Sequence, residues 1–408
     1  MSAPPAAPPA PRRALSDARA PLRLGGSASA PALPRLDGVD LLRGLSILAV
    51  VLLHIQIRLR FAGFRPGAAL PRWLSHLLFN NGNNGVTVFF AISGFLIATT
   101  SLRRFGSLAA LQPAAFYRFR FARIAPLLLL VLAILSALHL LHVPEFVLRP
   151  ERASLPRALL AALTFHLNWL EAARGWLPPA WDILWSLSIE ELFYLVFPLA
   201  CALLLRRRGG GVAFVALLLG FVAAGPFARS FRETNEIWQE KSYLGGMDAI
   251  ALGVLTALLV ERLSKQTPPP RAALALLTLA GAALLFWIAV WPRWALMGII
   301  GREGLDGSIL AIGTCCIVLA TALGGRAGSP LTAPLRWFGR HSYEVYLTHE
   351  FLVVPAIALW VRVQRGPLPL WVVATVLACA PLGALVARGF SEPLNRRLRA
   401  ADGSQRAA

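Results

Sequence analysis

The stretch WDILWSLSIEELFYLVFPLA, residues 181–200, is apolar and long enough to cross a lipid bilayer, yet it contains three acids. Asp182, Glu190 and Glu191 lie within a run of aromatic and aliphatic side chains. A charged group inside the hydrocarbon is costly, so an acid in a membrane span usually faces the interior of a helix bundle and marks a functional site. The stretch therefore predicts a membrane-spanning fold that contains a buried functional site.

The composition of the whole chain supports a membrane fold. Of the 408 residues, 57% are hydrophobic and only 15% are charged, and the mean hydropathy is +0.62. Soluble domains of this size are less apolar. Ten apolar stretches are long enough to span as helices, so we expect an all-α polytopic membrane bundle of about ten transmembrane helices. The expected spans are 40–60, 85–102, 124–142, 183–205, 211–228, 244–263, 272–291, 305–324, 337–361 and 368–388.

One further apolar segment, ALLAALTFHLNWL at 158–170, is only about 13 residues long, which is short for a crossing. If this segment is re-entrant or interfacial, 24 of the 40 basic residues fall on the side that holds both termini, and 15 fall on the other. Arginine and lysine are enriched in short cytoplasmic loops, so both termini are expected to be cytoplasmic. The net charge of +20 then reflects membrane topology, and no nucleic-acid partner is expected.

The two ends of the chain differ in composition from the spans. Residues 1–35 are rich in Pro, Ala, Ser and Arg, which predicts a disordered cytoplasmic tail. They do not read as a signal peptide, because no apolar segment precedes Leu41. We expect one membrane domain over 36–394 and a cytoplasmic tail over 395–408. The four cysteines lie in apolar stretches without metal-ligand or disulfide spacing, so we expect small core residues and no metal.

Two ionisable residues occur in the first expected span, LDGVDLLRGLSILAVVLLHI, residues 36–55. Arg43 and His54 are 11 residues apart, a rotation of about 1100°, which places both side chains on one helix face about 16 Å apart. The pattern indicates a polar path through the bundle interior. An alternative is that His54 only hydrogen-bonds a neighbouring helix while Arg43 extends to the cytoplasmic interface.

Glu190 is expected to be a partner of His54. With the topology above, Glu190 lies about 10 Å and His54 about 9 Å below the outer ends of their spans, so the two side chains could meet. A carboxylate bonded to one imidazole nitrogen raises the basicity of the other, as a general base requires. Glu191, also a candidate catalytic acid, is about 100° further round and would pair with an arginine. The alternative is an ion pair that only holds helices together.

An arginine cluster precedes the third expected span in FYRFRFARIAP, residues 116–126. Arg118, Arg120 and Arg123 suit a phosphate-rich cytosolic ligand, because guanidinium groups bind phosphate through two parallel hydrogen bonds. Arginines that only set the membrane topology would explain the cluster equally well.

Two further polar residues lie inside expected spans. Ser93 stands beside Gly94 in GVTVFFAISGFLI, residues 85–97, where small residues favour a helix-packing interface over a catalytic serine. Asp248 in YLGGMDAIALG is an intramembrane acid for which the sequence offers no partner, and its role stays open.

Near the C-terminus, RWFGRHSYEVYLTHEFLV, residues 336–353, carries a polar stripe. Ser342, Tyr346 and His349 follow i, i+4, i+7 spacing and therefore share one helix face, which predicts an inward polar surface. Tyr343 lies in the same span.

Together these segments resemble the acyltransferase-3 family of integral membrane acyltransferases, which includes enzymes that O-acetylate bacterial surface glycans and other acceptors. The resemblance covers about residues 36–394. Five motifs in the family's order carry it: the Arg-x10-His spacing of Arg43 and His54, the R-x-x-R pair Arg120 and Arg123, FFxLSGFLI at 89–97, WSLSxEEqFY at 185–194 and SYxxYLxH at 342–349. In the fourth motif, Leu192 replaces the glutamine.

The resemblance implies an enzyme of the bacterial inner membrane that moves an acetyl or another acyl group from cytosolic acyl-CoA to a hydroxyl of a carbohydrate, glycolipid or similar acceptor. Carried over by position, His54 would be the catalytic base and Glu190 its partner. Arg43 would be a charge near the donor, and Arg120 with Arg123 would contact the donor phosphates. Acetyl-CoA is then the expected donor substrate.

Two other functions fit the same residues. In a transporter or flippase, the ionisable groups Glu190, Asp248, His54 and His349 would form a proton relay. That function predicts inverted repeats, and none is evident in the sequence. A non-catalytic sensor would keep the fold without turnover.

Overall fold

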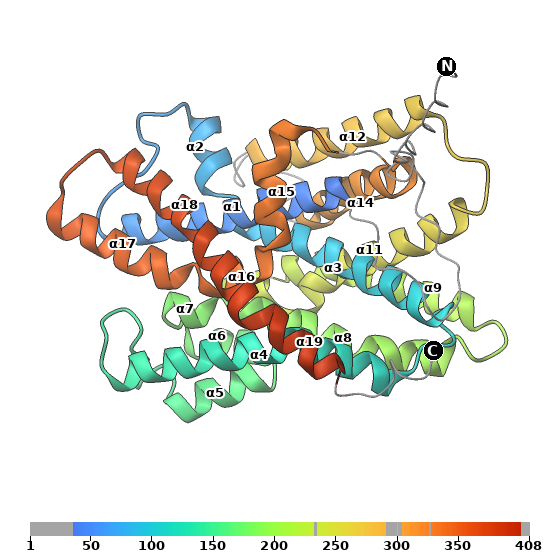
Figure 1. Ribbon diagram of the computed structural model, residues 1–408, viewed down its shortest axis with the longest axis horizontal. Coiled ribbons are helices and arrows are strands. Elements are labelled where there is room, and N and C mark those ends of the chain that lie inside the picture. The colour runs from blue at the N-terminus through green and yellow to red at the C-terminus, as the bar shows by residue number, and fades with distance from the viewer. Residues whose placement is uncertain (1–35, 232–234, 291–299, 301–303, 326–327, 401–408) are drawn as a thin grey trace, which may run out of the picture.

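The computed structural model describes residues 36–231, 235–290, 300, 304–325 and 328–400. These residues form an all-α bundle (Figure 1). Within them, nine helices are long and apolar enough to cross a membrane, and ten spans result if one bent pair of helices counts as a single span. The predicted all-α polytopic fold is confirmed.

The spanning helices follow the predicted segments, because apolar length decides where a chain can cross. Their bounds are α1 Asp37–Phe61, α3 Gly82–Phe105, α4 Pro113–Leu140, α8 Trp185–Leu204, α9 Gly210–Ser230, α11 Tyr243–Leu263, α12 Arg271–Val290, α14 Leu305–Gly324 and α18 Leu368–Val386. The bent pair is α16 Ser342–Thr348 and α17 Glu350–Val363, which meet at 48°.

Two predicted spans differ from the helices observed. The segment predicted at 124–142 is part of α4, which begins eleven residues earlier with Pro113 in its first turn, a position where proline favours helix initiation. The arginine cluster therefore lies on a helix rather than in a loop. The segment predicted at 337–361 is divided into α15 Ala333–Arg340, α16 and α17, and the break before α17 falls at His349.

Short helices complete the bundle. The segment 158–170 forms the end of one short helix and the start of the next, separated by a turn in which Phe165 has a φ of 58°. Part of the predicted tail 395–408 is helical, and residues 1–35 and 401–408 lie outside the described residues. The short helices are α2 Arg72–Phe79, α5 Leu155–Leu163, α6 Leu167–Arg174, α7 Pro179–Asp182, α10 Glu236–Lys241 and α19 Glu392–Ala400. Two other helical turns are η2 Pro330–Thr332 and η3 Ala387–Ser391.

The helices α3 and α11 pack closely because glycine lies at their contact. A Cβ on Gly94 would come within 2.0 Å of the carbonyl oxygen of Ile250, and a Cβ on Gly253 within 2.0 Å of that of Ala91. Neither distance is sterically allowed, so only glycine permits this approach. The predicted packing role of the Ser93–Gly94 pair is thus confirmed for Gly94.

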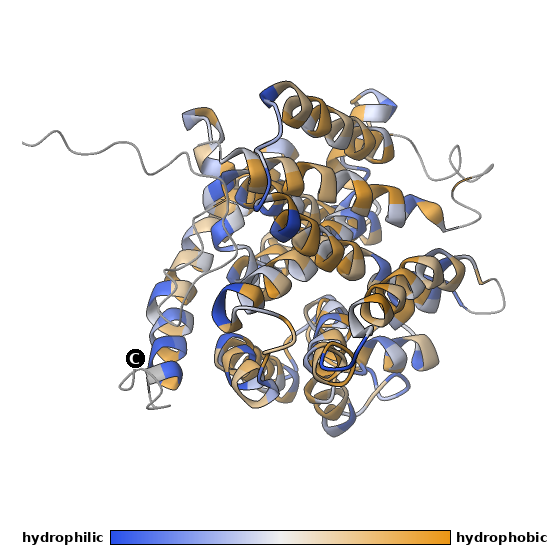
Figure 2. Ribbon diagram, turned by 90° about the vertical axis from the view of Figure 1, so that its right-hand side faces the viewer, coloured by the Kyte–Doolittle hydropathy of each residue, from blue (hydrophilic) through white to orange (hydrophobic). Residues whose placement is uncertain are grey.

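The surface of the bundle matches a lipid environment. Large apolar side chains on the outer helices are exposed, among them Leu203, Leu276 and Leu385. Figure 2 shows hydrophobic residues along the long helices and many hydrophilic residues on the helix beside the C-terminus, α19. The apolar surface belongs to the spans, whereas α19 is amphipathic and carries four charged residues.

We expect Gly94→Val and Gly253→Val to separate α3 from α11 and to lower stability by several kcal/mol, because an overpacked core must shift its backbone. Thermal unfolding of the purified protein, followed by fluorescence-detected size exclusion, measures this loss. The matched control is Gly220→Val on α9, where an added Cβ meets nothing within 4 Å. Equal melting temperatures for all three variants would show that the α3–α11 contact does not need glycine.

Candidate active site

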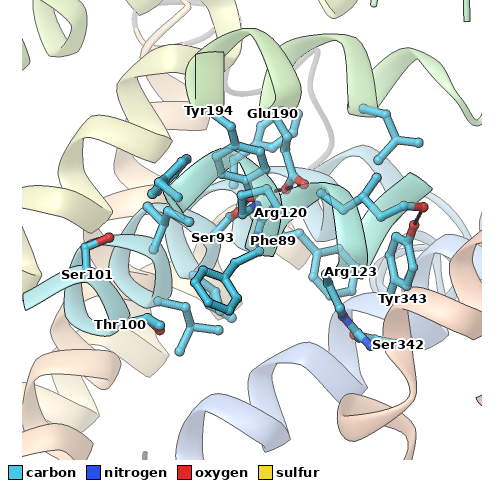
Figure 3. A pocket seen from close by; sticks show the side chains of 18 of the residues that line it. Phe89, Ser93, Thr100, Ser101, Arg120, Arg123, Glu190, Tyr194, Ser342 and Tyr343 are labelled. Carbon is cyan, nitrogen blue, oxygen red and sulfur yellow. Dashed lines mark hydrogen bonds between the residues drawn. The ribbon is translucent and has the colours of Figure 1, made fainter. Parts of the chain in front are cut away.

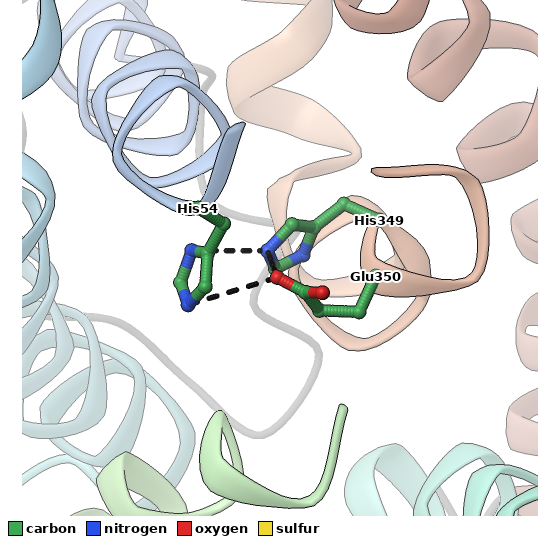
Figure 4. Close-up of side chains that lie close together, drawn as sticks. All are labelled: His54, His349 and Glu350. Atoms are coloured by element: carbon green, nitrogen blue, oxygen red, sulfur yellow. Dashed lines mark hydrogen bonds and ion pairs between the residues drawn. The ribbon is translucent and has the colours of Figure 1, made fainter. Parts of the chain in front are cut away.

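The break between α16 and α17 places two side chains against His54 of α1 (Figure 4). His54 Nδ1 lies 3.3 Å from His349 Nε2, and His54 Nε2 lies 3.8 Å from Glu350 Oε1. His349 Nε2 is 3.7 Å from the same oxygen. His349 and Glu350 are fully buried, whereas the His54 side chain is 13% exposed. The three side chains form a compact polar cluster, here called the histidine cluster.

Contacts with backbone carbonyl oxygens show which ring nitrogens of His54 and His349 carry the protons. His349 Nδ1 lies 2.7 Å from the carbonyl oxygen of Tyr346, so this nitrogen is the donor and His349 Nε2 is an acceptor. His54 Nδ1 faces both that acceptor and the carbonyl oxygen of Val50, at 2.8 Å, and therefore donates to them. This arrangement leaves His54 Nε2 with its lone pair free, as a general base needs.

Glu350 faces the free nitrogen of His54. Neither carboxylate oxygen has a hydrogen-bond partner, and the two imidazoles lie 3.7 and 3.8 Å from Oε1, with Arg58 also acting on the carboxylate electrostatically. A buried carboxylate without hydrogen bonds is costly, and a proton taken up by His54 would place a compensating charge beside it. Glu350 is therefore positioned to stabilise the imidazolium form of His54. The sequence analysis did not identify Glu350, although it follows His349 directly.

The predicted pairing of His54 with Glu190 is wrong. Glu190 Oε2 accepts a hydrogen bond from Tyr194 at 3.5 Å, and the contacts of His54 are with α16 and α17 instead. The depth calculation was the cause, because equal depth in the bilayer does not determine which way a side chain points around its helix. Glu191 is buried next to Glu190. The positive charge of Arg120 acts on Glu191, so an arginine is near this acid, as the sequence analysis expected.

A cavity of about 400 Å³ lies between α1, α3, α4, α8 and α16 (Figure 3). It brings together residues from every predicted motif. Of the predicted site residues, it is lined by Arg43, Ser93, Arg120, Arg123, Glu190, Ser342, Tyr343 and Tyr346. Arg118 points elsewhere and lines a neighbouring hollow. His54 and His349 are not among the residues that line the cavity.

Three arginines extend into the cavity from α1 and α4. Arg43 Nε donates to Ser342 Oγ at 3.2 Å, and Arg123 Nη1 lies 3.3 Å from Glu344 Oε1. The Arg120 guanidinium lies 3.6 Å above the ring of Tyr194. The Arg123 guanidinium also lies 5.0 Å from the centroid of the Tyr343 ring. A guanidinium has five N–H donors, more than these contacts use, which suits an anionic or phosphorylated ligand.

Tyr346 stands between the cavity and the histidine cluster. Its hydroxyl donates to the carbonyl oxygen of Ile183 at 2.8 Å and lies 2.8 Å from Ser186 Oγ. Its ring centroid lies 6.1 Å from that of His349. Because Tyr346 lines the cavity and also contacts the cluster, it is the boundary between the two. The predicted inward stripe of Ser342, Tyr346 and His349 is confirmed by these contacts.

The remaining intramembrane acids belong to structural ion pairs. Asp248 accepts two hydrogen bonds from Arg229, at 3.0 and 2.7 Å, and a third from Ser308 at 2.5 Å. The partner that the sequence analysis could not assign is therefore Arg229. Asp182 pairs with the buried Lys241.

Among the described residues, His54, His349 and Glu350 also form a group whose ligand atoms all lie within 4.8 Å of one another. Two histidines and one carboxylate can bind Zn²⁺ and leave a fourth position open. We still expect a proton rather than a metal ion between the two rings, because the contacts with the backbone carbonyls make His54 Nδ1 a donor and His349 Nε2 an acceptor. The predicted absence of a metal remains a prediction.

We expect the protein, purified without chelators, to contain far less than one equivalent of zinc. Elemental analysis of the wild type beside a His349→Gln variant measures this directly. Stoichiometric zinc in the wild type that is lost in the variant would make the histidine cluster a metal centre.

Comparison with known proteins identifies the family. The family model described as "Acyltransferase domain" matches residues 36–387. O-acetyltransferase OatA of Staphylococcus aureus strain NCTC 8325 / PS 47 is 23% identical over 385 residues, which cover 89% of this chain and 57% of that protein. A putative O-acetyltransferase of S. aureus strain COL is 23% identical over 334 residues, covering 77% of this chain and 50% of that protein.

The chain thus spans little more than half the length of these curated relatives. No solved structure matches it. The family match covers most of the chain, including all of the cavity except Arg399 and the whole histidine cluster. The chain therefore belongs to the acyltransferase-3 family of integral membrane acyltransferases.

Proposed function

We propose that this protein transfers an acetyl group from acetyl-CoA to a hydroxyl group of a carbohydrate or glycolipid acceptor. One observation carries the proposal: an imidazole with a free, oriented nitrogen contacts His349, whose ring lies 6.1 Å from that of Tyr346 in the lining of an arginine-rich cavity. The printed names of the relatives, O-acetyltransferases, agree with an acetyl group and an oxygen acceptor.

The donor would enter the arginine-lined cavity from the side of the membrane that holds the N-terminal end of α1 and the C-terminal end of α18. Most basic residues outside the spans lie on this side in the predicted topology, which supports a cytoplasmic orientation. Arg120 and Arg123 would bind the diphosphate of the donor, and Arg43 lies deeper, beside Ser342. The thin acyl-carrying arm would then extend toward Tyr346.

The reaction would use the proton arrangement of the histidine cluster. His54 Nε2 removes the proton of the acceptor hydroxyl as its oxygen attacks the thioester carbonyl carbon. The carbon–sulfur bond then breaks, and the imidazolium returns the proton to the leaving thiolate. The products are the acetyl ester and CoA. Glu350 would stabilise the imidazolium, and His349 would hold the ring in the productive tautomer.

Tyr346 has to move before the two substrates can meet. In the structure its hydroxyl is bonded to Ile183 and Ser186, and its ring lines the cavity 6.1 Å from the ring of His349. Rotation of this side chain would connect the donor cavity to His54. The freed hydroxyl could then donate a hydrogen bond to the oxyanion of the tetrahedral intermediate.

The transporter or flippase alternative requires a continuous relay of ionisable groups. The described residues divide the four candidate groups among three separate sets: His54 with His349, Glu190 with Tyr194, and Asp248 with Arg229. The enzyme is therefore the better supported function.

We expect His54→Gln to reduce acetyl transfer at least 100-fold, because general-base catalysis contributes about that factor or more. Nanodisc-embedded protein, labelled acetyl-CoA and a cell-envelope glycan fraction provide the assay. The control is His142→Gln, which changes an exposed histidine. Transfer that survives in His54→Gln would exclude this base, and a correctly folded wild type without transfer to any glycan would exclude the proposed reaction.

A second comparison separates the two glutamates. We expect Glu350→Gln to lower kcat about tenfold or more with little change in KM for acetyl-CoA, since Glu350 faces the base. Glu190→Gln should mainly change KM, since Glu190 lines the donor cavity near Arg120. The initial-rate kinetics of both variants would reject this assignment if the two effects were reversed.

A further inference from the structure

The outer mouth of the donor cavity is built from parts of the chain that no family motif includes. Helix α19 packs against α4, as Figure 1 shows, and contributes Arg399 to the cavity lining. Arg104, in the last turn of α3, lines the same mouth. These two residues lie outside the R-x-x-R pair and were not singled out in the sequence.

The two arginines share one aromatic ring. The guanidinium carbon of Arg104 lies 3.2 Å from the centroid of the Phe119 ring, and that of Arg399 lies 5.4 Å from it. The charged groups that act on Arg399 are Arg120 and Arg123, which have the same sign. Like charges gathered at one opening repel each other, and a bound anion would relieve that repulsion. The mouth is therefore arranged for an anionic ligand.

A second hollow of about 390 Å³ lies beside the mouth. Phe119 and Arg399 line both spaces, so they form the wall between them. The hollow is otherwise lined mainly by aromatic and apolar side chains, including Tyr117 and Phe121, with Arg118 at its side. Aromatic rings beside arginines are the usual surface on which proteins stack nucleic-acid bases.

From its inner end to its mouth, the cavity presents its lining residues in an order that can be compared with the groups of an extended ligand. Of the cavity-lining residues of α3, Val86 and Arg104 lie farthest apart, 18 residues, which corresponds to about 27 Å. Arg120 and Arg123 lie seven and ten residues into α4, and so between these ends. A coenzyme A thioester carries its groups in a matching order: acyl group, slender arm, diphosphate, then a ribose phosphate and adenine.

From these observations, and relying on the proposed donor, we infer that the mouth is a nucleotide subsite. Arg399, together with Arg104, binds the 3′-phosphate on the ribose of the donor, and the hollow beyond Phe119 holds its adenine. Arg120 and Arg123 are then left for the diphosphate. The same phosphate chemistry could come from an anionic lipid headgroup, so the experiment must separate the two sources.

The test uses equilibrium binding by the full chain in nanodiscs of zwitterionic lipid. Acetyl-CoA is compared with acetyl-dephospho-CoA, which lacks only the 3′-phosphate. We expect the wild type to bind acetyl-CoA about tenfold more tightly, the factor that one charge-assisted phosphate contact supplies. Arg399→Ala should lose this preference by weakening acetyl-CoA alone, and Arg399→Lys should keep part of it.

The matched control is Arg397→Ala, since Arg397 is exposed, lies about 200° round α19 and lines neither space. It should bind both donors as the wild type does. Thermal unfolding of each variant excludes a folding defect. Equal affinity of the wild type for both donors, or an equal loss of both in Arg399→Ala, would overturn the subsite and leave the proposed function standing.

Two further outcomes would also overturn the inference. If the wild type binds neither donor, the proposed function fails together with the subsite. If Arg399→Ala leaves donor binding unchanged but abolishes retention of labelled phosphatidylglycerol, the mouth binds a lipid phosphate instead. The lipid measurement uses nanodiscs that contain a small fraction of phosphatidylglycerol.

Discussion

The structure depends on one constraint: an ionisable side chain inside a bilayer needs a partner, because the hydrocarbon cannot solvate it. Several buried ionisable groups of the bundle are matched to a residue distant in sequence. Lys241 Nζ lies 2.9 Å from Glu171 Oε2, and Arg229 holds Asp248. These pairs join α6 to α10 and α9 to α11, so the need for a partner also fixes how the helices are arranged.

The number of hydrogen bonds that a buried acid accepts distinguishes structural acids from a candidate catalytic acid in this bundle. Asp248 receives hydrogen bonds from Arg229 and Ser308 and is fully matched, as a structural pair should be. Glu350 is equally buried but has no hydrogen-bond donor on either oxygen. A native core rarely tolerates such a group without a reason. A base that must become charged during a reaction supplies that reason, since the unmatched carboxylate prefers a cation beside it.

Apolar length and motif spacing predicted most of the fold and half of the site geometry. The spans were predictable because the bilayer demands a fixed length of apolar helix, and the shared location of Arg43, Arg120 and Arg123 was implied by the family motifs. The partner of His54 was not predictable in the same way. The depth of a residue in the bilayer follows from counting residues along its helix. The direction in which the Glu190 side chain points depends on how α8 is rotated about its own axis in the bundle. The break at His349, which carries Glu350 to His54, leaves no signal in hydropathy.

The separation between cavity and histidine cluster has a physical purpose in the proposed reaction. A cavity that continued past Tyr346 to the partly exposed His54 would join the two sides of the bilayer by a polar path, and water would reach the thioester. Tyr346 closes that path with two hydrogen bonds of its hydroxyl to the α7–α8 region. These bonds are few enough to break when both substrates are present. A single side chain can thus keep the membrane sealed at rest and still allow the donor and acceptor to meet.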